Sequence, residues 1–361
     1  MPKAKRIFLV AGARPNFMKV APLYRKMKEY PDSFDPIFVH TGQHYDHNMS
    51  TSFLRDLGLP EPDIYLGVGS GSHAVQTAKI MIEFEKALLE KKPGLVMVVG
   101  DVNSTIACAL VASKLFVPIA HIEAGLRSFD RTMPEEINRV LTDQISDYLF
   151  TTCEEAEENL IREGVSKDRI HFVGNLMIES LIHCLPKIEA SEILSRFDLE
   201  PKEYVLVTLH RPSNVDDSGV FRGILEALLE IGERRKVIFP VHPRTRNMIS
   251  EIGVGMNHGI QLTEPLEYFD FMALQKNAGV VLTDSGGVQE ETTYFRVPCL
   301  TLRENTERPI TVTQGTNRLI GMDRRDILKG MDDLNGTGNQ TRPGIRFWDE
   351  KVSERIVQIL K

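Results

Sequence analysis

Short apolar runs that alternate with longer stretches of helical period constrain the fold of this chain more than any other sequence feature. The run Leu95–Val99, for example, is apolar on both faces, which is typical of a central parallel strand covered by helices on each side. Alternating strands and helices predict α/β domains with doubly wound parallel sheets. The runs that we expect as strands are 7–10, 37–40, 95–99, 119–122, 148–151, 204–209, 237–240, 279–283 and 298–302.

The length of 361 residues predicts two domains, because a domain commonly has about 100–200 residues. Residues 171–203 lack a clear strand and contain a glycine and two prolines, so we place the junction there. We therefore expect one Rossmann-like domain over residues 1–172, a second over 173–346, and a closing helix over 347–361.

Three stretches of the first half have helical period, namely residues 72–90, 103–115 and 134–147. The first of these has an apolar stripe, which predicts the face that packs against the protein interior. The stripe includes Ala74, Ala78, Ile82 and Leu89.

The charge balance limits the possible partners. The chain has 43 basic and 50 acidic residues, for a formal net charge of −7. A protein that binds polyanions needs a cationic surplus, so nucleic acid and acidic membranes are not expected as main partners. A small anionic ligand held by a few local bases remains compatible with this charge.

Other features indicate a cytoplasmic protein. The apolar stretch at residues 7–11 is shorter than a usual signal-peptide core, and no run approaches the roughly 18 apolar residues that cross a bilayer. The four cysteines lie far apart without a C-x-x-C pair, so neither a disulfide scaffold nor a thiolate zinc site is expected.

Polar residues follow the expected strands in both halves. Ligands of an open parallel sheet bind outside the carboxyl ends of its strands, so this placement indicates a ligand site. The residues concerned are Arg14, Gln43, His44, Asp101, Glu123, His210, Arg211, His242 and Asp284.

A Ser285-Gly286-Gly287 turn joins an expected strand to an expected helix. Backbone N–H groups at such a turn form a natural phosphate site, and Glu291 could accept hydrogen bonds from ribose hydroxyls. The alternative is that Ser285 caps the helix and the glycines only turn the chain.

The first loop has the same strand–turn–helix form. Arg14 lies just before the helix and Lys19 about one turn inside it, so both could face an anion. The loop is not G-x-G-x-x-G, and no nicotinamide cofactor is implied. The alternative is that both are solvated surface bases.

Three acids of the first half, Asp101, Glu123 and Glu135, could divide acid and base duties. Asp101 could instead be a helix N-cap, and Thr132 with Glu135 matches a capping box. Glu135 could also pair with Arg139 on its helical face. Glu123 has no comparable structural explanation.

The second half offers further basic groups. His210-Arg211 and His242 each follow a strand, which favours an anion site; a metal site is poorly supported because the spacing matches no metal motif. Arg303, Glu307 and Arg308 could hold a phosphate or simply pair with one another.

Taken together, these motifs resemble those of the non-hydrolysing UDP-N-acetylglucosamine 2-epimerases. The resemblance follows the chain in order over nearly its whole length. It implies the glycosyltransferase-B arrangement, with two Rossmann-like domains about a deep cleft and a last helix that returns to the N-terminal domain. The matching stretches are 12–19, 42–44, 100–101, 121–127, 133–139, 210–211, 241–243, 282–291 and 306–309.

The resemblance implies reversible inversion at C2 of UDP-GlcNAc, which gives UDP-ManNAc for cell-surface polysaccharides. In this family UDP is eliminated to leave 2-acetamidoglucal and is then added back. No cofactor or metal is implied, a UDP-sugar is the expected small-molecule partner, and we expect a homodimer.

The resemblance also assigns roles to residues. The implied catalytic residues are Asp101, Glu123, Glu135 and His210. The implied substrate-binding residues are Arg14, Lys19, Arg139, Ser285, Gly286, Gly287, Glu291 and Arg308. In some bacterial members a second, activating UDP-GlcNAc site is formed by the residues that correspond to Gln43, His44, Glu136, Arg211 and His242.

Several other functions remain open at this stage. The substrate could be a UDP-2,3-diacetamido uronic acid, which related enzymes epimerise at C2. A UDP-sugar-dependent glycosyltransferase would share the scaffold, and a non-catalytic sensor would bind UDP-GlcNAc without changing it. A hydrolysing epimerase would release free ManNAc and UDP.

Overall fold

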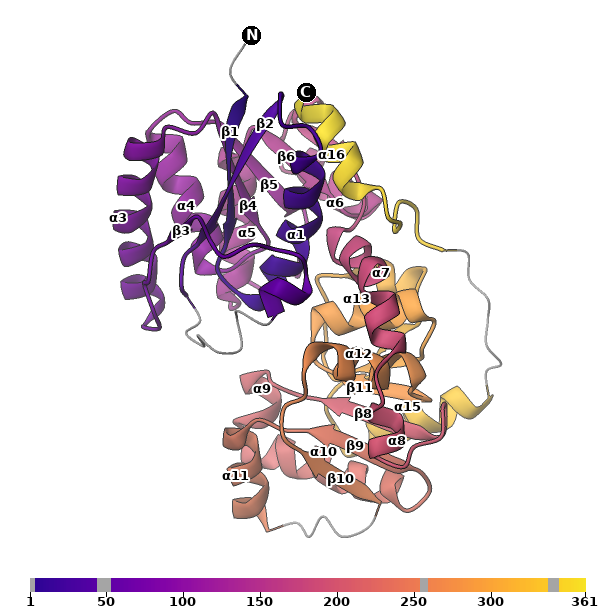
Figure 1. Ribbon diagram of the computed structural model, residues 1–361. Coiled ribbons are helices and arrows are strands. Elements are labelled where there is room, and N and C mark those ends of the chain that lie inside the picture. Colours follow the sequence, from indigo (N-terminus) through magenta and orange to yellow (C-terminus); the bar gives the residue numbers. More distant parts are fainter. Residues whose placement is uncertain (1–3, 44–52, 254–258, 337–343) are drawn as a thin grey trace. The chain divides into compact units, whose positions relative to one another are not determined.

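Two parallel β-sheets, each with helices packed on it, form the framework of the computed structural model (Figure 1). The structure describes residues 4–43, 53–253, 259–336 and 344–361. It divides into an N-terminal unit of Met1–His183 with Arg346–Lys361, and a C-terminal unit of Cys184–Ile345. The division after residue 183 falls inside helix α7 (Leu176–Glu189).

The sheet of the N-terminal unit has seven strands among the described residues, in the order β3-β2-β1-β4-β5-β6-β7. All neighbouring strands are parallel, so their carboxyl ends lie along one edge. The strands are β1 (Lys5–Ala11), β2 (Phe34–His40), β3 (Ile64–Tyr65), β4 (Leu95–Val99), β5 (Ile119–Ala124), β6 (Tyr148–Thr151) and β7 (Ile170–Phe172).

Helices cover both faces of this sheet. Figure 1 shows α3 and α4 on one side of β1 and β2, and α1 with α16 on the other. Helix α16 is tied to α1 by Glu354, whose carboxylate lies 3.3 Å from Nζ of Lys26 and accepts a hydrogen bond from the hydroxyl of Tyr30. Besides α7, the helices are α1 (Arg14–Lys28), α3 (His73–Lys91), α4 (Asn103–Lys114), α5 (Pro134–Ile145), α6 (Glu154–Arg162), the 3₁₀ helix η1 (Lys167–Arg169) and α16 (Val352–Leu360).

The apolar stripe expected on α3 is not its buried face. Ile82 and Leu89 are 56% and 57% exposed, and Ala74 and Ala78 are also exposed. The helix is turned because larger side chains lie on another face and bury more apolar surface there. The residues that are buried are Gln76, Ile80, Phe84, Ala87 and Leu88.

The C-terminal unit repeats the design: where the structure describes it, its sheet has six parallel strands in the order β10-β9-β8-β11-β12-β13. The strands are β8 (Tyr204–Thr208), β9 (Lys236–Pro240), β10 (Ile260–Thr263), β11 (Val280–Thr283), β12 (Cys299–Thr301) and β13 (Asn317–Leu319). Helix α10 packs against α9, α11 and α15, whereas α12 packs against α8 and α13. The helices are α8 (Ile193–Arg196), α9 (Pro212–Val215), α10 (Ser218–Gly232), α11 (Pro243–Ile252), α12 (Tyr268–Asn277), α13 (Gly286–Phe295), α14 (Pro309–Thr313) and α15 (Arg324–Gly336).

The central strands supply the core of each unit. Every residue of β4 is buried, as its two-faced apolar sequence predicts. The core of the C-terminal unit includes the fully buried Phe221 and Phe239. Burying one side chain of this size contributes about 1.5–3 kcal/mol to stability.

The predicted fold class, two Rossmann-like doubly wound parallel sheets, is confirmed. All nine expected strands occur, with ends that differ by at most a few residues. The strands that were not expected are β3, β7, β10 and β13. Each of them lies at an edge of its sheet.

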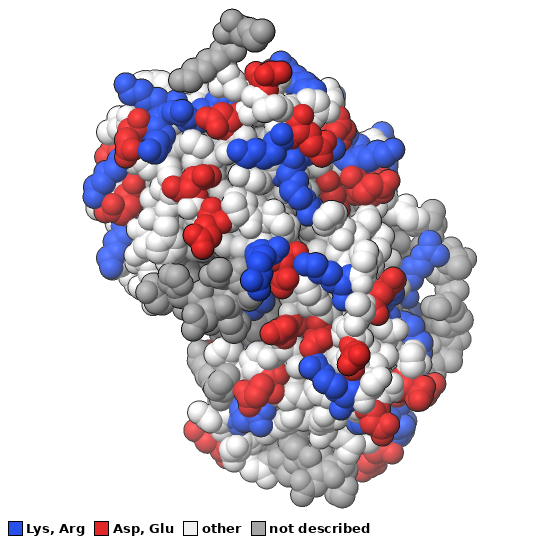
Figure 2. Space-filling view, in the orientation of Figure 1, with Lys and Arg blue, Asp and Glu red and all other residues white. Residues whose placement is uncertain are grey.

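The surface of the protein carries charges of both signs. On the face drawn in Figure 2, acidic and basic side chains are interspersed, and no broad basic patch gathers there. Among the helices that the structure describes, none combines the length and the apolar character needed to cross a bilayer. The four cysteines are buried free thiols.

Candidate active site

A buried ion pair joins two predicted site residues of the N-terminal unit. Nζ of Lys19, on α1, contacts a carboxylate oxygen of Glu123, on β5, and these side chains are only 7% and 5% exposed. Gly100, which follows β4, lies beside this pair with a φ of +66°. A Cβ at Gly100 would lie 3.3 Å from the Glu123 carboxylate, so glycine allows the close approach.

Glu123 occupies an unusual backbone position. It lies at an irregularity in the pairing of β5 with β6, between Ile122 and Ala124, and its φ is +73°. A left-handed conformation of a non-glycine residue costs about 1–3 kcal/mol, and such strain is concentrated at functional sites. The bulge directs the Glu123 side chain toward Lys19.

Two further predicted residues of this unit, Asp101 and Glu136, meet at Arg139. Nε and Nη2 of Arg139 lie 2.9 and 2.8 Å from Oδ2 of Asp101, and Nη1 contacts Glu136. Asp101 is not the helix cap that the sequence allowed, because the N-cap of α4 is Val102. We call Lys19, Asp101, Glu123, Glu136 and Arg139 the N-terminal cluster.

Glu135 is placed differently from the other two acids. It lies in the first turn of α5, half-buried, and no ion pair engages it within the described part of the chain. The expected capping box is absent, since the N-cap is Met133 and the Thr132 hydroxyl donates to Asp130. Arg139 pairs with Asp101 and Glu136 rather than with Glu135.

In the C-terminal unit the buried carboxylate of Asp284 organises the ends of two adjacent strands. It accepts hydrogen bonds from the backbone N–H groups of His210 and Arg211, at 3.0 and 2.9 Å, and from Nδ2 of Asn214 at 3.1 Å. Its Oδ1 also lies 2.8 Å from Nδ1 of His210, whose imidazole is 63% exposed. Asp284 thus holds the exposed ring in one orientation.

The pKa of Asp284 reflects these contacts. Burial alone would raise the pKa, but the hydrogen bond and charge of His210 and the N–H donors of Arg211 and His210 hold it below its usual value. The carboxylate therefore stays ionised and can stabilise positive charge on His210 during a reaction.

The Gly-rich turn opens α13 as the sequence predicts. Ser285 is the N-cap residue, yet its side chain makes no capping hydrogen bond, which argues against the simple capping alternative. Glu307 lies against this turn, because a Cβ at Gly286 would approach its Oε1 to 2.5 Å. The turn thus combines a helix N-terminus with close packing that only glycine permits.

The arginines near this turn are paired with carboxylates. Nε of Arg308 lies 3.0 Å from Oε1 of Glu290, and Nη2 of Arg303 lies 2.7 Å from Oε2 of Glu307. Arg211 donates from Nε to the backbone carbonyl of Asp284 at 3.0 Å. We call His210, Arg211, Asp284, Glu307 and Arg308 the C-terminal cluster.

Glu291 is buried one turn further along α13. Burial raises its pKa to about 8, although a hydrogen bond of 3.1 Å from Nε2 of Gln275 works in the opposite direction. A protonated carboxyl group can both donate a hydrogen bond to a hydroxyl and accept one from it.

The remaining predicted residues are spread out. Arg14 is exposed, with its guanidinium 4.9 Å from the ring centroid of Phe53. Gln43 is buried and accepts hydrogen bonds from the backbone and hydroxyl of Ser104. His242 is exposed at the start of α11, and His44 lies outside the described residues.

Glu136, predicted as part of an activating site, stabilises the loop at Ser128 and Phe129 in this structure. Its carboxylate accepts hydrogen bonds of 2.9–3.0 Å from the backbone N–H groups of Ser128 and Phe129 and from the Ser128 hydroxyl. Glu136 therefore has a structural function whether or not it also binds a second ligand. The activating site stays a prediction.

Sequence reasoning missed several residues that build these clusters. Asn16 donates a hydrogen bond to the backbone carbonyl of Val99 and accepts one from the backbone N–H of Gly12, in the turn before α1. Gln275 donates to Glu291, and Glu290 pairs with Arg308. Asp284 was noted only among the polar residues that follow strands, without a role of its own. A polar residue inside an otherwise apolar strand–helix segment was the available signal.

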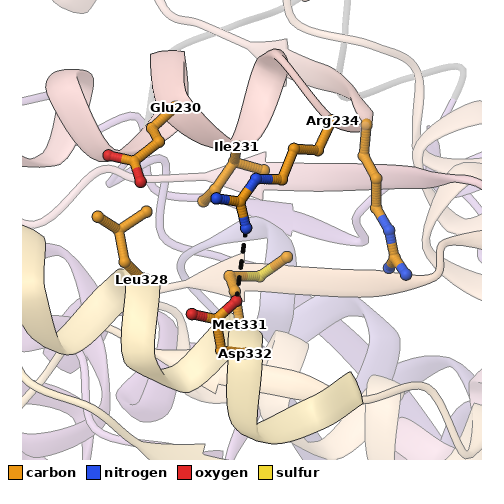
Figure 3. Close-up of a pocket in the computed structure, with 7 residues that line it drawn as sticks. Glu230, Ile231, Arg234, Leu328, Met331 and Asp332 are labelled. Atoms are coloured by element: carbon orange, nitrogen blue, oxygen red, sulfur yellow. Dashed lines mark ion pairs between the residues drawn. The ribbon is translucent and has the colours of Figure 1, made fainter.

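A small pocket elsewhere is not part of the candidate site. It lies between α10 and α15, has a volume of about 50 Å³, and is crossed by an ion pair of 3.6 Å from Arg234 to Asp332 (Figure 3). Arg234 follows the end of α10, where the chain returns to the amino end of β9. The pocket is thus at the opposite end of the sheet from the C-terminal cluster, and its volume suits only one or a few waters.

Comparison with known proteins shows which family the chain belongs to. The sequence profile described as UDP-N-acetylglucosamine 2-epimerase matches residues 25–361. The UDP-N-acetylglucosamine 2-epimerase of Methanocaldococcus jannaschii is 44% identical, over 98% of each chain. The chain belongs to the UDP-N-acetylglucosamine 2-epimerase family. This confirms the resemblance seen in the motifs and makes the enzyme class an isomerase.

The chain is also similar in structure to solved UDP-N-acetylglucosamine 2-epimerases. A crystal structure of the Methanocaldococcus jannaschii epimerase in complex with UDP-GlcNAc and UDP has a TM-score of 0.90 and 43% identity, and covers 98% of this chain and 99% of that one. One relative within the epimerase family has another name: the UDP-2,3-diacetamido-2,3-dideoxy-D-glucuronate 2-epimerase of Pseudomonas aeruginosa is 43% identical, over 98% of this chain and 99% of its own.

Proposed function

We propose that this chain inverts C2 of UDP-GlcNAc reversibly and thereby forms UDP-ManNAc. The observation that carries the proposal is the buried Lys19–Glu123 pair beside Asp101 and Arg139, at the carboxyl edge of the N-terminal sheet. Family membership, shown over nearly the whole chain, supports it. The predicted homodimer and the role in polysaccharide synthesis stay predictions.

The proposed chemistry is elimination followed by addition. A base removes the C2 proton while the C1–O bond to UDP breaks, which leaves 2-acetamidoglucal with a C1–C2 double bond. A proton then returns to the opposite face of C2, and a phosphate oxygen of UDP bonds to C1 again. No oxidant or reductant is consumed, so the residues have to supply only proton transfer and charge stabilisation.

Glu123 is the strongest candidate for one proton-transfer group. Its carboxylate is buried, fixed by the bulge and paired with Lys19, whose cation stabilises the ionised form. Asp101 and Glu135 complete the proposed acid–base set. Asp101 is partly exposed and oriented by Arg139, so it is accessible to a sugar ring.

The C-terminal cluster, together with helix α13 and the turn that opens it, is proposed to hold the nucleotide. The turn at Ser285–Gly287 supplies backbone donors to the diphosphate, and Glu291 supplies hydrogen bonds to the ribose. His210, oriented by Asp284, and Arg308 add charge near the departing phosphate. Such groups stabilise the negative charge that develops when UDP leaves.

The second candidate substrate is a UDP-2,3-diacetamido uronic acid. The Pseudomonas aeruginosa relative that carries this name is almost as similar to the chain as the Methanocaldococcus jannaschii epimerase, so similarity alone does not separate the two sugars. The C2 chemistry would be the same for both.

The test follows C2 by proton NMR while the protein acts on UDP-GlcNAc in D₂O, without added metal or nicotinamide. The proposal predicts deuterium at C2 and a UDP-ManNAc signal. If C2 keeps its proton and no new sugar forms, the UDP-GlcNAc proposal is wrong. The diacetamido uronic acid nucleotide then serves as the second substrate; sugar transfer or release of free ManNAc would identify the other enzyme classes.

A further inference from the structure

His121 and Asp143 form a fully buried pair in the N-terminal unit. Nδ1 of His121, on β5, lies 2.6 Å from Oδ1 of Asp143, on α5, and both side chains are 0% exposed. Burying polar groups costs free energy unless each has its partners. The partners of this pair therefore show which parts of the molecule it holds.

The imidazole holds the turn before Asp101. Nε2 of His121 lies 2.8 Å from the backbone carbonyl oxygen of Gly100. Each ring nitrogen of His121 therefore faces an oxygen atom, the Asp143 carboxylate at Nδ1 and the Gly100 carbonyl at Nε2. Gly100 immediately precedes Asp101 and itself donates its N–H to the carbonyl of Ile122 at 3.1 Å.

The carboxylate holds the chain just after Glu123. Oδ2 of Asp143 accepts a hydrogen bond of 3.1 Å from the backbone N–H of Gly125, two residues beyond Glu123. The same oxygen lies 2.7 Å from Nη2 of Arg127, whose Nε donates to Glu163 at 2.8 Å. Burial alone would raise the pKa of Asp143, but His121 and then Arg127 hold it below its usual value.

We propose that His121 and Asp143 are positioning residues for the epimerisation: one buried pair fixes both the Gly100–Asp101 turn and the bulge that carries Glu123. This inference rests on the proposed function, in which these two carboxylates take part in acid–base chemistry. Neither His121 nor Asp143 is exposed, so both act through the residues that they hold. A misplacement of about 1 Å in a reacting group can lower a rate about 100-fold.

Two substitutions separate the contacts of the imidazole. His121→Asn places an amide nitrogen near the position of Nδ1 and keeps the contact with Asp143, but it cannot reach the Gly100 carbonyl. His121→Gln places its amide nitrogen near the position of Nε2 and keeps a donor toward Gly100. We expect kcat to fall about 100-fold in His121→Asn with KM little changed, and His121→Gln to recover at least about tenfold of the loss.

A control variant for the His121 substitutions lies at the end of α5, the helix that carries Asp143. Ser146, which follows α5, is buried and donates to the carbonyl of Thr142 at 2.8 Å, away from both turns. Ser146→Ala removes one buried hydrogen bond and is expected to keep wild-type kcat. Wild-type kcat in His121→Asn, or equal losses in the Asn and Gln variants, would overturn the proposal.

An experiment on the unaltered protein does not depend on the folding of a variant or on activity. ¹⁵N NMR of the histidine rings should show one ring with an N–H proton that is protected from exchange with solvent. Absence of any protected ring N–H would overturn the proposal. Absence of C2 exchange in wild-type protein would instead reject the proposed function and leave this ring measurement unaffected.

Discussion

Glu123 combines three features that rarely occur together in a residue with only a structural role. It is buried, its backbone is left-handed at a bulge, and its carboxylate is paired with a buried lysine. Burial of a charged pair is expensive, and strain adds to that cost. The sequence indicated Glu123 as the acid with no comparable structural explanation, and its role in the reaction stays a prediction.

Replacing this carboxylate should stop the chemistry without unfolding the chain. Glu123→Gln keeps the size of the side chain but cannot accept a proton, so kcat should fall by at least about 100-fold. This is the lower end of the rate enhancement that one positioned acid or base contributes. UDP affinity should change little because the nucleotide contacts are assigned to the C-terminal cluster. Steady-state kinetics and calorimetry measure both quantities.

A surface glutamate provides the control for this variant. Glu158 is exposed and pairs with Arg162 at 3.2 Å on α6, so Glu158→Gln should leave kcat and stability nearly unchanged. Turnover close to wild type in Glu123→Gln would remove Glu123 from the proposed acid–base set.

Glu291 should give the folded protein a distinct pH dependence. Its pKa is raised to about 8 in the folded state, from an ordinary value near 4.5. Between these values the folded state binds more protons than the unfolded state, so this group makes the unfolding free energy fall as pH rises, by at most ~1.4 kcal/mol per pH unit. Its favourable contribution is complete below about pH 4.5 and lost above about pH 8.

The glutamine variant isolates this effect. Glu291→Gln should lose the part of the pH dependence that Glu291 causes, and become more stable relative to wild type as pH rises from 5.5 to 8.5. Urea unfolding of both proteins at several pH values measures the difference. Parallel curves for the two proteins would show that Glu291 titrates normally.

Single residues of the site were easier to predict than their partners. Lys19, Glu123, Asp101 and Arg139 were each expected in a functional role, and the structure brings them into two adjacent ion pairs. The contacts of Asp284 could not be predicted, because they join strand ends about 70 residues apart in the sequence. Their proximity depends on the order of strands in the sheet.

At the level of elements, the sequence identified the strands that are buried on two sides. β4 and β11 have apolar residues on both faces because helices cover both, and this leaves a strong pattern. The strands β3, β7, β10 and β13 pair on one side only and are two to four residues long. Such short edge strands need little apolar sequence, so no pattern marks them.

The buried face of α3 could not be predicted from the sequence pattern. Two apolar stripes compete on this helix, and periodicity alone cannot choose between them. The stripe with Phe84 and Ile80 is buried, whereas Ile82 and Leu89 remain exposed. The larger apolar surface and its fit to the neighbouring helix decide the choice.

The turn that opens α13 offers a test at the level of one element. A Cβ at Gly286 would meet Glu307, which Arg303 holds in place. Gly286→Ala should therefore displace the turn and raise the Kd for UDP at least about tenfold, which corresponds to ~1.4 kcal/mol. Calorimetric titration with UDP measures the change.

Gly223, in α10, is the matched control for this substitution. A Cβ there meets nothing within 4 Å, so Gly223→Ala should leave UDP affinity unchanged and stabilise the protein by about 0.4–1 kcal/mol. If Gly286→Ala binds UDP as well as Gly223→Ala does, the turn is not the diphosphate site.

Over the whole molecule, charge placement explains how an acidic chain can hold an anionic ligand. The net charge is −7, yet Lys19, Arg139, Arg211 and Arg308 lie near the carboxyl ends of strands, each close to a carboxylate. Within each unit a few such bases suit a small anion, whereas a polyanion would need a continuous basic surface. The net charge therefore argues against polyanionic partners but not against a small anionic ligand.

The central claim, that C2 inverts through loss and return of UDP, is tested most directly with UDP-GlcNAc that carries ¹⁸O in the bridge between C1 and the β-phosphorus. If the C1–O bond breaks, rotation of the β-phosphate lets a different oxygen return to C1. ³¹P NMR of the recovered nucleotide sugars should then show ¹⁸O in non-bridging positions as UDP-ManNAc forms. Formation of UDP-ManNAc with all the ¹⁸O still in the bridge would contradict the mechanism.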